Sequence, residues 1–441
     1  MIFMNENTSF KRNDPKVITG WALFDWANSA YSLTIASAIF PAYFEERTNH
    51  VVKVLGIEMY NTTLFAFAVA LSYLVIACIS PLLSGIADYS GRKKFFLRFF
   101  TTVGSLACMS LFFFDGNGDL AIGTLGFVLA TVGFAGSLVF YNSYLPDIAT
   151  EDMYNRVSAK GFAYGYFGSV LLLIFNLVVL LNPTWFGLPE EGTLAARLAF
   201  LTVGLWWIGF AQISFRRLPK DTGKAFSIKL LTRGVDEFKK VWRAVKSARN
   251  IKFFLLSFFF YSAGVQTVLS LASLFAKVEM KMETSELIIV ILLLQFLGIA
   301  GAWLFAKLSD RTGNKMGLMI MLALWTVVCV AGFFVAEKWH FYLLAASVGL
   351  VMGGVQSQSR STYSKLLPEK TPDTTSYFSF YDVLEKAATA LGAFSFAFTG
   401  QLSGGMRYSV LALAVFFLAG LLLLTTVQIR PLKNPNHDTS V

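Results

Sequence analysis

The chain has 441 residues, of which 55% are hydrophobic and only 15% are charged. This composition excludes a water-soluble protein, whose core could not hide 44 Phe and nine Trp residues, and it indicates a chain that spans a bilayer. The formal net charge of +10 would suit a nucleic-acid partner, but the distribution of the basic residues described below argues against one.

The first part of the chain contains six apolar segments long enough to cross a membrane. We predict helices at 17–44, 60–86, 95–114, 120–145, 158–181 and 194–215. In the first of them, Asp25, Asn28, Ser29 and Ser32 recur at helical spacing and form one polar stripe. A carboxylate facing lipid costs about 3 kcal/mol, so the stripe is expected to face protein or water. It either serves a functional site or only packs against a neighbouring helix.

A basic segment, 216–250, separates these helices from six further apolar segments. The second group is predicted at 251–276, 286–308, 316–336, 340–364, 375–400 and 406–428. The chain therefore divides into an N-terminal tail (1–16), an N-terminal half (17–215), a linker (216–250), a C-terminal half (251–429) and a C-terminal tail (430–441). Apolar residues at helical spacing between Val235 and Val245 predict that part of the linker is a helix on the membrane surface.

Basic residues predict the orientation of this all-α membrane protein with twelve transmembrane helices. If both termini lie on one side, 29 of the 37 Lys and Arg residues lie on that side, and only seven lie on the other. Because positive residues concentrate on the cytoplasmic side, both termini are expected to be cytoplasmic. The N-terminus is expected to be retained, with the first helix inserting the chain, and the short loops favour the cytoplasmic (inner) membrane of a bacterium.

The two halves contain an internal repeat. Asp88 and Asp310 lie 222 positions apart, each after the second helix of its half, and at the same offset Gly91 matches Gly313 and Tyr141 matches Tyr363. A match without gaps over several positions predicts two six-helix halves in parallel repeat, related by an axis along the membrane normal.

The loop around Asp88 resembles a known family signature. The run that contains Gly85, Asp88, Gly91 and Arg92 is similar to the loop motif of the major facilitator superfamily, whereas the copy around Asp310 is degenerate. More narrowly, GWALFDWANSAY at 20–31, FYNSYLP at 140–146 and GGVQSQSRS at 353–361 resemble the vacuole effluxer family, relatives of the fungal autophagy-related vacuolar amino-acid exporter. The resemblance implies the major facilitator fold and a secondary transporter of an amino-acid-like solute.

The loop signature also predicts contacts that would close the cytoplasmic side. Asp88 is expected to face the N-terminus of the helix at 375–400, where unsatisfied N–H groups favour negative charge. Arg92 is expected to pair with Asp147, whereas Lys93 and Lys94 are expected to be ordinary positive-inside residues. The predicted gating set consists of Gly85, Asp88, Gly91, Arg92, Asp147, Asp310 and Gly313.

The helix at 375–400 carries three ionisable residues, Asp382, Glu385 and Lys386. The i,i+4 spacing lets Asp382 and Lys386 neutralise each other and leaves Glu385 without a local partner. A partly dehydrated carboxyl group can bind and release a proton near neutral pH, so Asp25 and Glu385 are the leading candidates for proton coupling. A static ion-pair cluster explains the three residues equally well.

Uncharged polar residues recur in other predicted helices. Such residues often only join helices, but the superfamily resemblance implies that the first, fourth, seventh and tenth helices line a cavity. On that basis the candidates are Tyr141, Asn142, Gln266, Gln356 and Tyr363. Arg360 lies near the cytoplasmic end of its helix, where it is a gating residue, an orientation signal or a clamp for an anionic group.

Several sequence features narrow the functional classes. The three His residues lie in predicted loops or the tail, the three Cys residues have no pairable spacing, and no phosphate-binding or hydrolase signature occurs. We therefore expect no enzyme activity, no metal and no cofactor. Two functions remain: a proton-coupled carrier of a small polar solute, and a flippase or exporter of an amphiphile such as a lysolipid. The expected partners are the solute, the coupling ion and membrane lipids, with the chain as a monomer.

Overall fold

The computed structural model describes residues 11–54, 56–223, 229–368, 371–403 and 405–429. Within these ranges the regular elements are helices and one hairpin of β1 (Val51–Val54) and β2 (Ile57–Tyr60), and the hairpin was not predicted from the sequence. Residues 1–10 of the predicted N-terminal tail, 224–228 of the linker and the predicted C-terminal tail at 430–441 lie outside the described residues.

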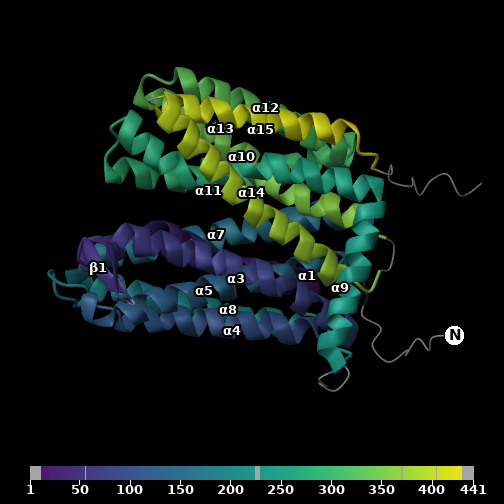
Figure 1. The fold of residues 1–441 in the computed structure, drawn as a ribbon, viewed down its shortest axis with the longest axis horizontal. Helices are drawn as coiled ribbons and strands as arrows, with labels where there is room; N and C mark the ends of the chain where they lie inside the picture. The colour runs from purple at the N-terminus through teal and green to yellow at the C-terminus, as the bar shows by residue number, and fades with distance from the viewer. Residues whose placement is uncertain (1–10, 55, 224–228, 369–370, 404, 430–441) are drawn as a thin grey trace, which may run out of the picture.

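The helices form two bundles that lie side by side (Figure 1). The bundle of the N-terminal half contains α1 (Pro15–Ala30), the π-helical η1 (Tyr31–Ile39), α2 (Phe40–Arg47), α3 (Asn61–Ser90), α4 (Lys93–Ser110), η2 (Leu111–Phe113), η3 (Asn117–Asp119), α5 (Leu120–Ser143), α6 (Leu145–Ile148), η4 (Glu151–Met153), α7 (Tyr154–Leu181), η5 (Pro183–Phe186) and α8 (Leu194–Arg217). The second contains α10 (Arg249–Glu279), α11 (Thr284–Thr312), α12 (Asn314–Phe334), α13 (Lys338–Leu366), α14 (Thr374–Ser403) and α15 (Met406–Thr425).

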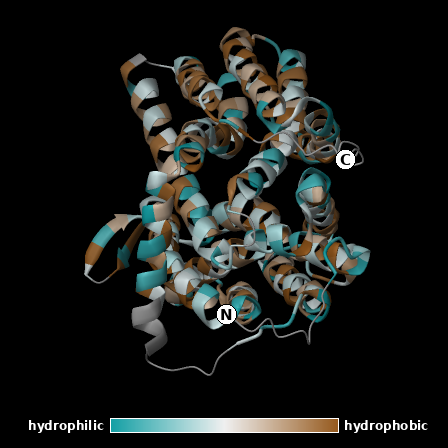
Figure 2. Ribbon diagram, turned by 90° about the vertical axis from the view of Figure 1, so that its right-hand side faces the viewer, coloured by the Kyte–Doolittle hydropathy of each residue, from teal (hydrophilic) through white to brown (hydrophobic). Residues whose placement is uncertain are grey.

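Each bundle has an apolar core of its own. One core is built from buried residues between Val17 and Leu218, and another from buried residues between Val241 and Val427. Large apolar side chains such as Phe67, Leu181 and Val415 remain 59–68% exposed on the outer surfaces of the helices. Figure 2 views the helices end-on and shows hydrophobic residues along the helices of both bundles. This distribution suits a chain whose solvent is lipid.

Nine helices within the described residues are long and apolar enough to cross a membrane, namely α3, α4, α5, α7, α8, α10, α11, α12 and α15. The other three predicted spans are the segment from α1 to α2, α13 and α14. These carry the buried Asp25, Arg360 and Asp382 respectively. Charged residues of the interior make α13 and α14 less apolar, whereas α1 has only 16 residues because the π-helical η1 follows it.

The linker helix α9 (Lys229–Ser247) lies across one end of both bundles (Figure 1). We call this end of the molecule the α9 end. The predicted linker helix is present, and its apolar residues Val241 and Val245 are buried in the core of the C-terminal half. The helix therefore packs on the protein, although Trp242 stays 53% exposed.

Candidate functional site

The two halves meet at the α9 end through Asp88. Its carboxylate accepts hydrogen bonds from the backbone N–H groups of Thr375 (3.1 Å) and Ser376 (2.7 Å), at the beginning of α14. The expected contact is therefore present. Three residues later, Gly91 ends α3 in the left-handed conformation (φ 65°) that favours glycine. A carboxylate at a helix N-terminus is favoured by both the hydrogen bonds and the helix dipole.

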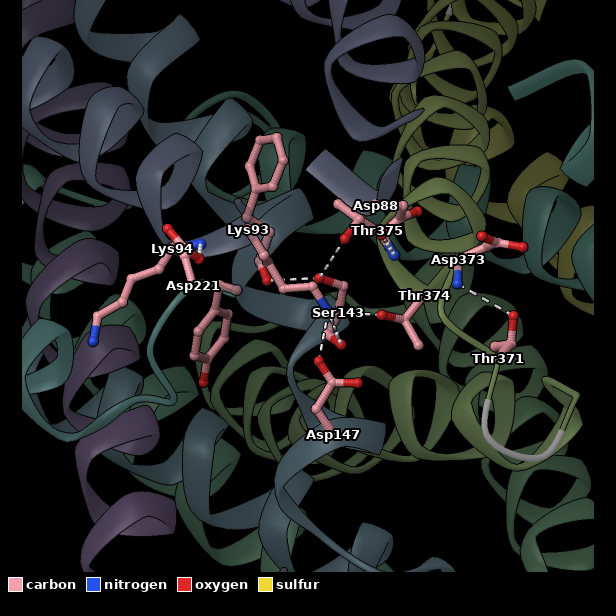
Figure 3. A network of polar contacts seen from close by, with 12 residues as sticks. Asp88, Lys93, Lys94, Ser143, Asp147, Asp221, Thr371, Asp373, Thr374 and Thr375 are labelled. Carbon is pink, nitrogen blue, oxygen red and sulfur yellow. Dashed lines mark hydrogen bonds and ion pairs between the residues drawn. The ribbon is translucent and has the colours of Figure 1, made fainter. Parts of the chain in front are cut away.

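Lys93, and not Arg92, pairs with Asp147, so the prediction for Arg92 is wrong (Figure 3). The ammonium group of Lys93 donates to the Asp147 carboxylate (2.6 Å) and also to the Thr374 hydroxyl (2.7 Å). Arg92 still belongs to the turn before α4, and its side chain packs against Gly223. Lys93 is the first helical residue, and it joins the N-terminal half to the start of α14. Below, "latch" means these contacts of Asp88 and Lys93 with Thr374, Thr375 and Ser376.

Lys94 is also more than an orientation signal. Its ammonium group donates to the carbonyl oxygen of Leu218 (2.8 Å), and its backbone N–H donates to Asp221 (2.8 Å). Asp221 thereby caps the N-terminus of α4. The chain that leaves α8 is thus fixed against α4. A pocket of about 310 Å³ lies between this segment and the latch, and Asp88, Lys93, Asp221 and Thr374 are among its lining residues.

The second copy of the loop also joins the two halves. Asp310, near the end of α11, accepts hydrogen bonds from the side chains of Asn155 and Arg156 at the start of α7, both at 2.9 Å. Gly313 caps α11 with a positive φ (86°). The repeat thus places two similar contacts between the halves, but Asp310 binds side chains where Asp88 binds backbone N–H groups.

Helix α9 adds a strap across the same end of the molecule. A Cβ atom at Gly85 in α3 would lie 2.2 Å from the carbonyl oxygen of Gly234, so the two helices touch backbone to backbone. The ring of Phe238 in α9 stacks on Phe380 of α14, with a centroid distance of 4.8 Å. The linker therefore contacts both halves at once.

An ionic cluster fixes the strap to the residue that precedes α14. Lys240 of α9 pairs with Asp373 (2.8 Å) and with Glu237 (2.5 Å). Hydrogen bonds to these two carboxylates raise the pKa of Lys240. Burial raises the pKa of Asp373, and the nearby Glu237 raises it further, whereas Lys240 opposes both effects. The cluster therefore keeps Lys240 charged.

A second polar site surrounds Asp25 and lies between the two halves. The carboxylate accepts hydrogen bonds from the Tyr141 hydroxyl (α5) and the Ser29 hydroxyl (α1), both at 3.1 Å. The guanidinium group of Arg360, from α13 in the other half, lies 3.8 Å away. Only 7% of the Asp25 side chain and 3% of the Arg360 side chain are exposed. The sequence predicted neither this pair nor its position between the halves.

The remaining N–H groups of Arg360 also bind the N-terminal half. They donate to the Asn142 side chain (3.0 Å), to the Ser158 hydroxyl (3.0 Å) and to the Ser158 carbonyl oxygen (2.8 Å). The guanidinium carbon lies 4.3 Å from the ring centroid of Phe162 and 4.7 Å from that of Trp21. Arg360 is thus a buried cation of one half that is held by the other.

The rest of the polar stripe on the first helix serves different contacts. Asn28 is fully buried; its Oδ1 accepts a hydrogen bond from Ser137 (3.2 Å), and its Nδ2 has no hydrogen-bond partner in the structure. Ser32 falls in the π-helical segment, where its carbonyl oxygen accepts a hydrogen bond from Ser37. The stripe therefore does not run as one α-helical face beyond Ala30.

The ionisable residues of α14 form a cluster within the C-terminal half. Lys386 pairs with Asp382 (3.4 Å), as the spacing predicted. Glu385 does have partners, contrary to the prediction: Lys386 lies 3.2 Å away, and the amide of Gln266 in α10 donates to it (3.0 Å). Lys386 can reach Glu385, its neighbour in the chain, because its side chain is long. Lys386 also lies 5.7 Å from the ring centroid of Tyr73 in the other half.

Of the other candidates, one lies at the contact between the two halves, which we call the seam, and one lies in the core of the C-terminal half. Gln356 accepts a hydrogen bond from the Tyr166 hydroxyl of the opposite half. Tyr363 is fully buried, stacks on Tyr381, and donates to the carbonyl oxygen of Tyr377, so it supports the first turn of α14 from within its own half.

Several contact residues were missed from the sequence. Trp21, Ser158, Phe162 and Tyr166 are ordinary residues of apolar helices, and no spacing marked them. A usable signal did exist for Asn155, because the 222-residue offset maps it onto Tyr377, next to the residues that bind Asp88. The internal repeat could therefore have predicted the contact of Asp310 with the start of α7.

Sequence comparisons place the chain among transporters. The model of the family described as "Vacuole effluxer Atg22 like" matches residues 13–434. An uncharacterized MFS-type transporter, YxiO, of Bacillus subtilis is 30% identical over 412 residues, which are 92% of this chain and 94% of that protein. Autophagy-related protein 22-2 of Neosartorya fischeri is 26% identical over 460 residues, covering 83% of this chain and 74% of the relative.

Solved structures with a similar fold are transporters as well. The fucose:proton symporter FucP of E. coli superposes with a TM-score of 0.68 at 13% identity, covering 94% of this chain and 98% of that chain. A bacterial homologue of the iron transporter ferroportin, described as outward-facing, gives 0.67 at 15% identity over 93% and 98% of the two chains. At these identities the likeness shows the fold alone.

Proposed function

Because this chain belongs to the vacuole effluxer Atg22-like family and has the major facilitator fold, we propose that it is a secondary active transporter that moves a small, amino-acid-like solute by alternating access. In this proposal transport is coupled to protons, and the chain works as a monomer. Twelve helices cross the membrane: the nine apolar spans together with the α1–α2 segment, α13 and α14. The α9 end and both termini face the cytoplasm of a bacterial cell.

The observation that carries the proposal is the chemistry of the contacts between the halves. At the α9 end these contacts include hydrogen bonds and ion pairs of Asp88, Lys93, Asp310 and Arg360, beside a small apolar cluster of Ala159, Ala302 and Ala306. Polar contacts of this kind can be exchanged for water, whereas an interlocked apolar core cannot open without a large cost. A seam of this composition suits two halves that rock apart and close again.

The geometry favours Asp25 over Glu385 as the coupling residue. The cationic partner of Asp25, Arg360, belongs to the other half, so separation of the halves changes the charge around the carboxylate. Glu385 keeps Lys386 and Gln266, which both belong to its own half. A coupling carboxyl must experience different surroundings in the two states, and Asp25 meets this requirement.

The alternative function, a flippase for an amphiphile, has less support. An apolar cavity of about 50 Å³ exists, but all of its lining residues, from Thr267 to Leu413, belong to the C-terminal half. It is therefore not a lateral opening between the halves.

The proposal is tested by measuring accumulation of the solute. In proteoliposomes, Asp25→Asn should abolish solute accumulation driven by a pH gradient, because an amide cannot carry the proton. Glu385→Gln should retain accumulation, as should the control Glu58→Gln on the exposed hairpin. Wild-type accumulation by Asp25→Asn would exclude this carboxyl from coupling.

A further inference from the structure

We propose that the residues around Arg360 form a binding site for an organic cation, in which Arg360 is a tethered occupant that leaves when the halves separate. The cation is a guanidinium or ammonium group of the transported solute, so the inference rests on the proposed function and assigns a substrate class to it. All the groups that hold Arg360 belong to the N-terminal half, and only the cation comes from the other half.

The first support is the set of acceptors. The guanidinium group meets the Asp25 carboxylate, the Asn142 amide oxygen and two oxygens of Ser158. An acceptor-only lining of this kind matches a planar cation with several N–H groups. With Arg360 in place, the lining is satisfied and the positive charge lies near Asp25.

The second support is the set of aromatic rings. The rings of Trp21, Tyr141 and Phe162 lie 4.7, 5.4 and 4.3 Å from the guanidinium carbon. Three aromatic rings around a cation are characteristic of sites that recognise organic cations. Trp21 and Tyr141 are themselves fixed, because they stack on each other at 4.5 Å and Trp21 donates to the Tyr141 carbonyl oxygen. Two of the three rings are thus held by contacts within the N-terminal half. We call the three rings and the oxygens of Asp25, Asn142 and Ser158 the cage.

The third support is the space that glycine leaves. A Cβ atom at Gly161 of α7 would lie 2.7 Å from the Tyr141 hydroxyl and 2.9 Å from the guanidinium group. A Cβ atom at Gly165, one turn further, would lie 2.8 Å from the Ser29 hydroxyl and 3.3 Å from the Asp25 carboxyl carbon. Helix α7 therefore approaches the site with its backbone, and no side chain fills the volume that the cation occupies.

Opening at the α9 end must leave this cage empty. Arg360 lies six residues, about 9 Å, from the end of α13, so it withdraws with the C-terminal half when the latch opens. A proton on Asp25 would then remove the unpaired charge, but it would leave the rings and the Ser158 and Asn142 oxygens without a cation. An organic cation from the α9 side satisfies all of these groups, and its release is driven when Arg360 returns.

The direct test is chemical rescue in purified protein. Arg360→Ala removes the side-chain atoms beyond Cβ from the cage, and these atoms are the same as those of ethylguanidinium. Ethylguanidinium chloride at 10 mM should raise the Tm of this variant by about 2 °C or more. Ethylurea, its neutral counterpart of the same shape, should leave the Tm unchanged. The rescue should disappear in Arg360→Ala combined with Asp25→Asn, and wild-type protein should not respond, because its cage is occupied.

If Arg360→Ala cannot be purified alone, purification in ethylguanidinium and not in ethylurea should recover the folded protein. Equal effects of the two compounds, rescue that survives Asp25→Asn, or recovery with neither compound would overturn the cation site.

A second experiment tests the substrate class. Proteoliposomes loaded with L-arginine should take up labelled arginine by exchange at least about tenfold faster than those loaded with L-citrulline, which carries a neutral urea in place of the guanidinium group. Equal exchange with both solutes would refute the cation selectivity and leave the proposed carrier function intact. Exchange with neither, alongside a positive rescue, would refute the transport role of the cage.

Discussion

The contact between Gly85 and Gly234 allows the strap to be tested separately from the latch. In Gly85→Ala the new methyl group would lie 2.2 Å from the Gly234 carbonyl oxygen and 3.0 Å from its carbonyl carbon. Both are backbone atoms, so α9 must move away as a unit. Forcing a methyl group into a packed contact costs about 1–3 kcal/mol. Within α3 itself, alanine is about 1 kcal/mol better than glycine, so the host helix is not weakened.

The cost falls on the docking of α9, and 1–3 kcal/mol corresponds to a change of about 5- to 150-fold in the docking equilibrium. Hydrogen exchange measured by mass spectrometry reports this equilibrium, because amides of a detached surface helix exchange faster by the same factor. The peptides that cover α9 should therefore lose protection, while those of α5 should not.

Gly209→Ala is the matched control, since Gly209 is also a helical glycine and a Cβ atom there would meet no atom within 4 Å. It should leave the exchange of α9 unchanged. If Gly85→Ala also leaves it unchanged, the backbone contact does not hold the strap, and the role of α9 between the halves must be abandoned.

Three further predictions concern the latch, the topology and the ionic cluster. Asp88→Asn should slow transport with the protein still folded, because it removes a charge–dipole interaction of about 0.3–2 kcal/mol at α14; unchanged kinetics would reduce Asp88 to a loop residue. Cysteines at Asn117 and Thr193 should react with an impermeant reagent from outside, and one at Thr222 only from inside; an inside reaction at Asn117 would contradict the map of twelve spans. Glu237 and Asp373 raise the pKa of Lys240. Its ammonium group therefore stays charged and keeps both ion pairs below the ordinary lysine pKa of about 10.4, and it loses them only at higher pH. Protection of α9, corrected for the intrinsic exchange rate, should thus be constant from pH 7 to 9, and a loss in this range would contradict the assignment.

The helices were predictable because long apolar segments have few alternatives in a bilayer. The predicted segment at 286–308, for example, corresponds to α11, and the one at 375–400 to α14. The contact of Asp88 was predictable because the loop signature and the start of the next half's helix together place a carboxylate opposite a helix N-terminus, which is a favourable arrangement.

The contacts that were missed depend on side-chain direction across the seam. Sequence spacing places Arg360 on a helix but does not show that the partner helix presents Asp25, Ser158 and three rings at the same depth. The choice between Arg92 and Lys93 was missed because it depends on where the turn ends and α4 begins, within one residue. The apolar face of α9 was found, but hydropathy alone does not distinguish a protein surface from a lipid surface.

The sequence distance across the latch has a consequence for synthesis. Asp88 and Ser376 are 288 residues apart. At about 5–20 residues per second, Asp88 is made roughly 15–60 s before the helix that it binds. During this interval the N-terminal half has to persist in the membrane with its Asp88 carboxylate and its Asp25 cage unoccupied by the other half. The newborn half is therefore a form of this protein in which neither site has its partner from the other half, and the order of synthesis makes it an intermediate for every copy.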